Sequence, residues 1–265
     1  MTKTIGVVSL KGGVGKTSVV VSLGSALSQL GKKVLLVDGN LSSPSLGLHL
    51  NVFEPEKTLH HVLSRSVNIK DSIYTRESLD LIPSSVFGDF SVSPMQLKDK
   101  IKNIKNKYDF ILIDSSPSLD EETLAVILAS DEIFVVTTSD HPTLSATLKS
   151  VKLARQRGIP ISGLILNKFQ NKDFEVSFED VESIINLPIM AVIPYDVGFL
   201  KALSNMESYI SYKPNSKASI EYKKLASVLT GEKYKQTRLQ DFLRKLTPSR
   251  QDINREIFYT RIFKE

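Results

Sequence analysis

The nine residues from Leu10 to Ser18, LKGGVGKTS, decide how the rest of the chain is interpreted. They follow a short apolar run at 4–9 (TIGVVS) that predicts a buried strand, and they open a helical pattern over 16–30. Glycines in such a turn let backbone N–H groups close around phosphate oxygens, because no Cβ blocks the approach, and the start of the helix adds partial positive charge. We therefore expect this loop to bind the phosphates of a nucleotide.

Within the loop, Lys16 is expected to reach the β- and γ-phosphates, and the hydroxyl of Thr17 to bind Mg²⁺. The strict pattern G-x-x-x-x-G-K-[ST] is not met, because its first position is Leu10, and an additional lysine, Lys11, follows. The residues of the loop that we expect to bind the nucleotide are Gly12, Gly13, Val14, Gly15, Lys16, Thr17 and Ser18.

Beyond the loop, apolar strand patterns alternate with helical patterns up to about residue 230. Further strands are predicted at 34–37, 79–82, 110–113, 133–137, 164–166 and 189–193, and further helices at 59–63, 95–107, 143–157, 176–185, 199–203 and 216–229. Continuous apolar strands that alternate with helices are typical of a parallel sheet covered on both sides. The fold class predicted is therefore a doubly wound, mostly parallel α/β sheet with helices on both faces.

Composition and charge narrow the class of protein and suggest where the chain divides. Hydrophobic residues make up 41% of the 265 residues, which excludes a disordered chain, and the absence of cysteine excludes disulfides and cysteine-ligated metal sites. Residues 233–265 hold nine Lys and Arg against four Asp and Glu, so they account for the whole net charge of +5. We therefore predict an α/β domain at 1–232 and a basic C-terminal extension at 233–265.

Two aspartates stand where predicted strands end. Asp38 follows the strand at 34–37, and Asp114 follows the strand at 110–113 (FILI). Carboxylates at the carboxyl ends of parallel strands face the ligand crevice of such a sheet. Asp38, Asp114 and Thr17 are therefore the expected Mg²⁺ site.

With the additional lysine, the loop resembles the deviant Walker A motif of the MinD/ParA family of P-loop ATPases, and the resemblance extends over about residues 1–230. It implies that the chain binds ATP with Mg²⁺ and that Lys11 reaches across a homodimer to the partner's nucleotide. ATP would then favour the dimer. The function implied is a weak ATPase that acts as a nucleotide-dependent spatial switch, in placing the division site or in partition and positioning.

One residue departs from the family pattern. The family usually has Asp-x-Asp after the second strand, where the second aspartate positions the attacking water, but this chain has Asp38-Gly39-Asn40. An asparagine can hydrogen-bond a water, but it cannot accept its proton. With Lys11, Lys16 and Asn40 as the catalytic residues, we expect hydrolysis that is slow or needs a partner. A scaffold dimer that holds ATP without hydrolysing it is the alternative.

The resemblance also assigns a site for the adenine base. It implies that the amide of Asn167 reads adenine beside Lys168, and that Pro194, Tyr195 and Asp196 close the pocket. Residues 115–119 are more similar to the ParA branch, whereas residues 139–144 are more similar to the MinD branch. A DNA-binding partition ATPase of the ParA type therefore stays open as another alternative.

The C-terminal extension begins with an apolar stripe. Leu239, Phe242, Leu243 and Leu246 recur at helical spacing, which predicts a short basic amphipathic helix over 238–246. Residues 252–265 fit a helix or a strand. By resemblance to MinD, the stripe binds anionic lipid. Alternatively, it packs on the domain or forms an oligomer contact. It could also bind DNA or a protein, such as an activator or a cargo. We expect a cytoplasmic protein that lies at the inner face of the cell membrane when the stripe binds lipid.

Overall fold

The structure is a computed structural model that describes residues 2–85, 92–232, 234 and 249–263. Its described strands form one eight-stranded sheet in the order β3-β4-β2-β5-β1-β6-β7-β8. Neighbouring strands are parallel except β3 and β4, which form an antiparallel hairpin at one edge. The strands are β1 Lys3–Val8, β2 Val34–Asp38, β3 Tyr74–Arg76, β4 Leu79–Ile82, β5 Phe110–Asp114, β6 Glu132–Thr137, β7 Ile161–Phe169 and β8 Ile189–Pro194.

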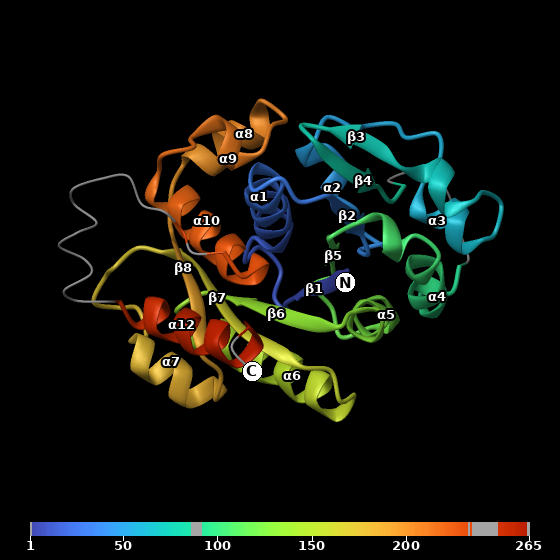
Figure 1. The fold of residues 1–265 in the computed structure, drawn as a ribbon. Helices are drawn as coiled ribbons and strands as arrows, with labels where there is room; N and C mark the ends of the chain where they lie inside the picture. Colours follow the sequence, from blue (N-terminus) through green and yellow to red (C-terminus); the bar gives the residue numbers. More distant parts are fainter. Residues whose placement is uncertain (1, 86–91, 233, 235–248, 264–265) are drawn as a thin grey trace.

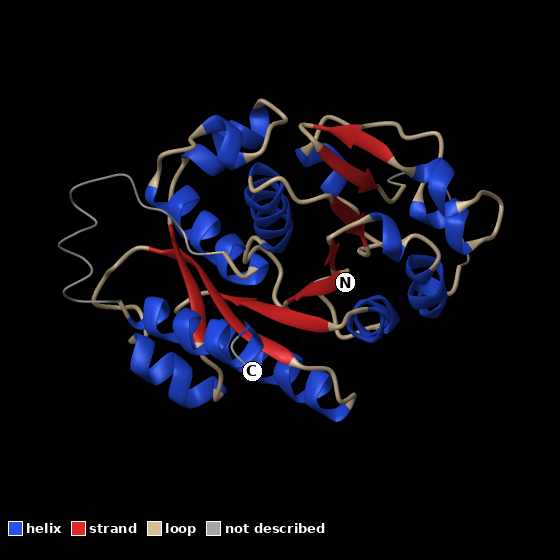
Figure 2. Cartoon of the chain, in the orientation of Figure 1, coloured by secondary structure: helices blue, strands red, loops and turns tan. Residues whose placement is uncertain are grey.

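Helices lie on both sides of this sheet (Figures 1 and 2). They are α1 Lys16–Gln29, α2 Leu46–His49, α3 Leu59–Leu63, α4 Leu97–Lys102, α5 Glu121–Ala129, α6 His141–Gln156, α7 Phe178–Ile185, α8 Gly198–Ser204, α9 Tyr209–Tyr212, α10 Lys217–Thr230 and α12 Arg250–Phe263. Short 3-10 helices span Ile69–Ser72, Pro94–Gln96 and Lys105–Lys107. The doubly wound, mostly parallel fold predicted from the sequence is confirmed.

Two apolar cores explain why the strands are apolar without interruption. Phe110 and Leu112 of β5 pack in one core with α1 and α10, whereas Ile111 and Ile113 pack in the other with α4, α5 and α6. Successive side chains of a strand point to opposite faces, so a strand covered on both sides needs an apolar residue at every position.

One prediction of local structure is wrong, and several elements were missed. The single helix predicted at 95–107 is wrong: α4 ends at Lys102, and fully buried Ile104 turns into the core before a separate 3-10 turn. Helix α5, strand β3 and the short helices α2 and α9 were not predicted. The side chain of Asp120 caps α5 by accepting from the N–H of Thr123 at 2.9 Å, and two glutamates follow in its first turn. That capping pattern is the signal in the sequence that reveals α5.

The last part of the chain, which fits either a helix or a strand by sequence, forms helix α12 along edge strand β8. The side chain of Asn254 donates to the carbonyl of Ile189 at 2.8 Å, and Arg255 donates to that of Met190 at 2.9 Å. Phe258 is buried in the same core as α1 and α10. Helix α12 therefore covers the outer edge of the sheet, while the helix predicted over 238–246 lies outside the described residues.

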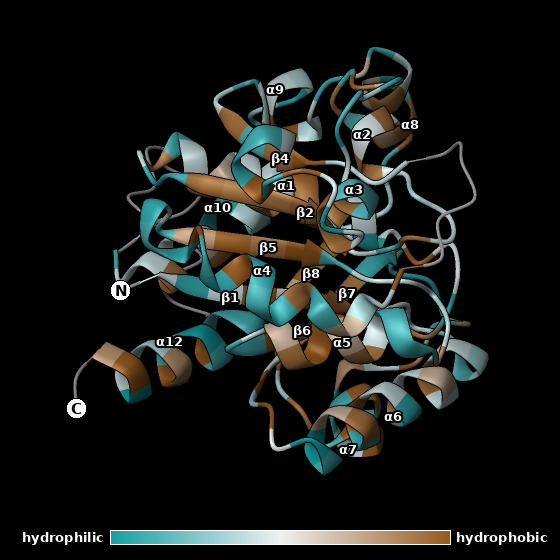
Figure 3. Ribbon diagram, turned by 90° about the vertical axis from the view of Figure 1, so that its right-hand side faces the viewer, coloured by the Kyte–Doolittle hydropathy of each residue, from teal (hydrophilic) through white to brown (hydrophobic). Residues whose placement is uncertain are grey.

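The ends of the chain share one side of the molecule. In Figure 3, β2 and β5 point away from the side where the N- and C-termini are marked, so both ends lie near the amino ends of the strands. The loops that follow the carboxyl ends of the strands lie on the opposite side. Among the described helices, none combines the length and the apolar composition needed to cross a membrane.

Candidate functional site

The predicted phosphate loop lies between β1 and α1, at the carboxyl edge of the sheet. Gly13 and Gly15 adopt left-handed backbone conformations, with φ of 77° and 91°. A Cβ on Gly15 would also lie 2.4 Å from Nδ2 of Asn167. Backbone geometry therefore favours glycine at both positions, and close contact with Asn167 favours it at Gly15 as well.

A hollow of about 250 Å³ lies against this loop. The side chain of Lys16 is buried there, and burial lowers its pKa while the charge of Asp114 raises it. A poorly hydrated ammonium of this kind gains more from an anionic ligand than one in water would. The lining residues are Gly12, Gly13, Gly15, Lys16, Thr17, Ser18, Asn40, Ser45, His49, Ser115 and Pro117.

The two predicted metal carboxylates are neighbours, because β2 and β5 pair in a register that places Asp38 beside Asp114. Both are fully buried. Oδ2 of Asp114 accepts from the hydroxyl of Thr17 at 2.6 Å. Burial raises the pKa of Asp114 to about 6, against the opposing effects of Thr17 and Lys16. Burial and the charge of Asp114 also raise the pKa of Asp38.

These groups fit a divalent cation. Oδ1 of Asp114 is buried and has no hydrogen-bond partner among the described residues, and it belongs to a carboxylate that already contacts Thr17. A cation held by Asp114 and Thr17 would satisfy that oxygen, and its charge would offset the repulsion between Asp114 and Asp38. Magnesium sites of this type use one or two carboxylates together with phosphate oxygens. The described residues contain no cluster of three or more His, Cys, Asp or Glu that could hold a metal.

Asp38 has a second task, which the sequence did not reveal. Its Oδ2 accepts from the N–H groups of Ser45 and Leu46 at 3.1 and 3.0 Å, and its Oδ1 accepts from that of Asn40 at 3.3 Å. Both oxygens therefore hold the loop after β2 in place. Through Ser45, whose hydroxyl lies 3.0 Å from that of Thr17, the same loop reaches the phosphate loop.

Asn40 is buried at the rim of the hollow. Its Nδ2 donates to the carbonyl of Ser43 at 2.5 Å, whereas its Oδ1 has no partner among the described residues. An unpaired buried oxygen is costly unless a water or a ligand reaches it. Asn40 therefore presents one hydrogen-bond acceptor to whatever occupies the hollow.

Glu122 joins the two loops beside the hollow, and sequence reasoning missed it. This first-turn residue of α5 accepts from the N–H groups of Leu41 and Ser42 at 2.9 and 3.0 Å and also contacts the hydroxyl of Ser42. It ties the loop after β2 to the helix that follows the loop after β5. Two of its three donors are backbone N–H groups, which carry no sequence signature, so only the position at a helix start could have drawn attention to Glu122.

The residues predicted to bind the base are divided between two places. Asn167 and Lys168, at the end of β7, contact the phosphate loop: Nδ2 of Asn167 donates to the carbonyl of Val14 at 2.7 Å. Pro194 and Tyr195 instead line a separate hollow of about 600 Å³ between the ends of β7 and β8 and helices α7, α10 and α12. Asp196 accepts from Tyr209 at 2.8 Å and Lys213 at 2.7 Å, which ties it to α9.

Lys11 is exposed at the mouth of the phosphate loop. Its ammonium is close enough to influence Asp140, at the start of α6. Burial raises the pKa of Asp140, but hydrogen bonds from Thr138 and Thr143 and the charge of Lys11 together lower it. Lys11 is thus placed at the surface beside the hollow, where its side chain can meet another molecule.

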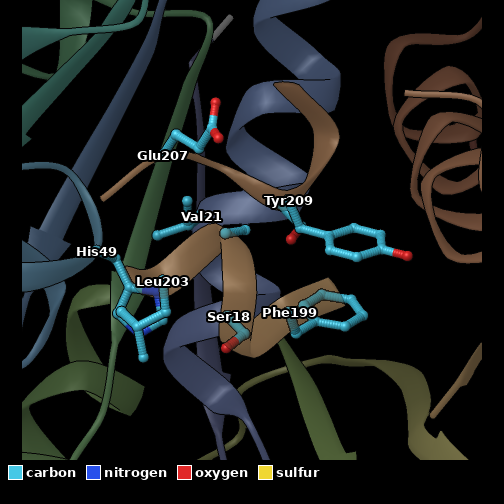
Figure 4. A pocket seen from close by; sticks show the side chains of 9 residues that line it. Ser18, Val21, His49, Phe199, Leu203, Glu207 and Tyr209 are labelled. Atoms are coloured by element: carbon cyan, nitrogen blue, oxygen red, sulfur yellow. The ribbon is translucent and has the colours of Figure 1, made fainter. Parts of the chain in front are cut away.

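Ser18 and His49 also line a gap between α1 and α8, seen in Figure 4 with the stacked rings of Phe199 and Tyr209, whose centroids are 3.7 Å apart. The gap measures only about 10 Å³, too little for a ligand. Burial lowers the pKa of His49 to about 4, so its imidazole is neutral near pH 7. We assign this gap to packing.

Comparison with known proteins agrees with this geometry. A family model described as an AAA domain matches residues 2–157. An uncharacterised ATP-binding protein of Methanocaldococcus jannaschii is 31% identical over 230 residues, which cover 86% of this chain and 88% of that protein. The sporulation initiation inhibitor protein Soj of Bacillus subtilis is 30% identical over 249 residues and covers 85% of this chain and 97% of its own length.

A solved structure agrees as well. The septum site-determining protein MinD of Pyrococcus horikoshii, complexed with Mg-ADP, superposes with a TM-score of 0.82 at 34% identity. The match covers 86% of this chain and 96% of that one.

Proposed function

The chain belongs to the MinD/ParA family of P-loop ATPases, and from this premise we propose that it binds ATP with Mg²⁺, dimerises through the bound nucleotide and acts as a nucleotide-dependent spatial switch. The observation that carries the proposal is a pair of buried oxygens beside the phosphate loop, Oδ1 of Asp114 and Oδ1 of Asn40, to which no described residue donates a hydrogen bond. The oxygen of Asp114 suits a cation, and the oxygen of Asn40 suits a water. Hydrolysis of a triphosphate needs both a cation and a water beside the phosphates.

Each residue of the site has a task in this proposal. The N–H groups of the loop and the ammonium of Lys16 bind the phosphates, while Thr17 and Asp114 hold Mg²⁺, with Asp38 behind them. The bound Mg²⁺ supplies positive charge that neutralises the phosphates. Oδ1 of Asn40 holds a water near the γ-phosphate. Because the transition state of phosphoryl transfer is loose, positioning alone supports slow hydrolysis.

The second part of the proposal concerns the dimer. Lys11 is exposed beside the hollow, and in a dimer its ammonium would reach the nucleotide of the other subunit. A contact that exists only when ATP is present makes nucleotide binding favour the dimer. Hydrolysis then resets the protein. We propose that this switch works in the cytoplasm with a protein activator or cargo. Residues 238–246 would contact an anionic membrane. Binding to DNA is the ParA-type alternative.

The scaffold alternative has a specific observation in its favour. Asn40 stands where the family has an aspartate, and its Nδ2 is already used by Ser43. No carboxylate is then left at this position to take the proton of the attacking water. In that case the ATP-bound dimer would persist without hydrolysis, and it would separate only when the nucleotide is released.

The experiment that tests the proposal is titration calorimetry with MgATP on the wild type and on Lys16→Ala. Removing a poorly hydrated ammonium that binds two phosphates should weaken binding by about 100-fold. Lys152→Ala, which removes an exposed lysine of α6, is the matched control and should bind like the wild type. Equal affinities for Lys16→Ala and the wild type would show that the site is assigned wrongly.

A further inference from the structure

Two consecutive residues at the end of β7 donate hydrogen bonds to backbone carbonyls of the phosphate loop. Nζ of Lys168 donates to the carbonyl of Gly13 at 2.6 Å, and Nδ2 of Asn167 donates to the carbonyl of Val14 at 2.7 Å. Both acceptors are neighbouring carbonyls of the loop backbone, more than 150 residues away in the sequence. Asn167 is buried, and Nδ2 would also contact any Cβ at Gly15.

A regular strand could not make this pair of contacts, because successive side chains of a strand point to opposite faces. In β7 the register with β8 shifts between Leu166 and Phe169. Within that irregularity Lys168 adopts a left-handed backbone, with φ of 58°. Such a conformation is unfavourable for lysine and persists only where the surrounding structure holds it. The irregularity brings both side chains to the same loop.

Holding the carbonyls of Gly13 and Val14 in place also fixes the direction of the N–H groups that follow them. In a trans peptide the C=O of one residue and the N–H of the next lie in one plane and point in opposite directions. When the Gly13 carbonyl faces Lys168, the N–H of Val14 therefore points away from β7. In the same way, the Val14 carbonyl held by Asn167 turns the N–H of Gly15 away. These N–H groups are the ones a phosphate needs.

We propose that Lys168 is a positioning residue, which together with Asn167 clamps the phosphate loop in its phosphate-binding shape before a nucleotide arrives. The inference rests on the proposed ATP site and adds to it a residue that acts on the loop from the side opposite the phosphates. A loop that is already ordered loses less entropy when it binds, so the clamp raises affinity.

The test compares Lys168→Met, which keeps the aliphatic stem and removes the ammonium, with Lys168→Arg, which keeps a cation. We expect MgATP affinity to fall about tenfold in Lys168→Met and less in Lys168→Arg, because one charge-assisted hydrogen bond is lost. In the nucleotide-free protein, amide hydrogen exchange over residues 11–17 should become faster in Lys168→Met. Lys152→Met makes the same change of charge on α6 and should alter neither quantity.

The exchange measurement is made without nucleotide, so it judges the clamp separately from the proposed function. If the wild type does not bind MgATP, the proposed function fails, while faster exchange in Lys168→Met still supports the clamp. If exchange over 11–17 is unchanged in Lys168→Met, the clamp is wrong, whatever happens to affinity. Should Lys168→Met fail to fold, Lys168→Gly, which suits the left-handed backbone, serves in its place.

Discussion

At the scale of single residues, Asn40 decides how the site works. It offers an acceptor to a water but no base, so the proton of that water must leave by another route. Changing Asn40→Asp adds a carboxylate at this point, and general-base catalysis commonly contributes a hundredfold or more. We expect turnover at saturating MgATP to rise by about tenfold or more, measured as phosphate release.

The control for this change is Asn205→Asp, which adds the same charge at the exposed end of α8 and should leave turnover unchanged. If the wild type already turns over as fast as Asn40→Asp, the asparagine does not limit hydrolysis and the scaffold alternative loses its support.

Asp114 sets a pH dependence. Burial raises its pKa from 3.8 to about 6 in the folded protein, so ionising it opposes folding. The stability linked to this group is therefore complete below about pH 4 and is lost as the pH rises through about 6.

In the nucleotide-free protein at about pH 7.5, Asp114→Asn should thus be more stable than the wild type by roughly 1–3 kcal/mol. The gain should shrink near pH 4, and the variant should lose the rise in melting temperature that MgATP gives the wild type. Thermal melts across this pH range measure both effects. If Asp114→Asn is less stable than the wild type at every pH, then ionising Asp114 does not lower the free energy of unfolding, and the prediction is wrong.

At the scale of secondary-structure elements, α12 is held by a buried arginine as well as by the buried ring of Phe258. Arg255 is only 3% exposed, donates to Glu221 and to the carbonyl of Met190 at 2.9 Å each, and also pairs with Asp252. Arg255→Met leaves these acceptors buried without a partner, and breaking such a pair costs about 3 kcal/mol or more.

Urea unfolding should show this loss, together with faster proteolysis within α12. Glu256→Gln, on the exposed side of the same helix, should behave like the wild type. Unchanged stability in Arg255→Met would mean that the apolar contacts of Phe258 are sufficient to hold the helix.

The sequence predicts the elements whose pattern is local. Apolar runs of three to six residues mark the strands, and Gly31, Gly158 and Gly231 stand just after predicted helices, all with positive φ in the structure. Helix α5 was missed although Asp120 caps it, and the helix at 95–107 was predicted too long because the burial of Ile104 depends on the rest of the fold.

The same limit applies to the site. The contact of Thr17 with Asp114 was foreseeable, because strand ends meet at one edge of the sheet. The contacts of Glu122 and Lys168 were not, because they are made mainly with backbone atoms and that of Lys168 depends on an irregularity within β7. The division into 1–232 and 233–265 stays a prediction, as do the roles assigned to the site residues.

At the scale of the whole molecule, the prediction concerns assembly. Lys11 lies outside the hollow, so Lys11→Ala should bind MgATP within a few-fold of the wild type. It should nevertheless remain monomeric at concentrations where the wild type dimerises with MgATP. Sedimentation velocity with MgATP and with MgADP measures this. If Lys11→Ala dimerises as readily as the wild type, the contact across the dimer is wrong.

The placement of the chain ends has a practical consequence. Both lie near the amino ends of the strands, on the side away from the phosphate loop. A fluorophore, or a link to a sensor chip, attached at either end would sit behind the sheet and leave the nucleotide face open to solvent. Surface-based measurements of association between copies should therefore report on the unobstructed face, whichever end carries the attachment.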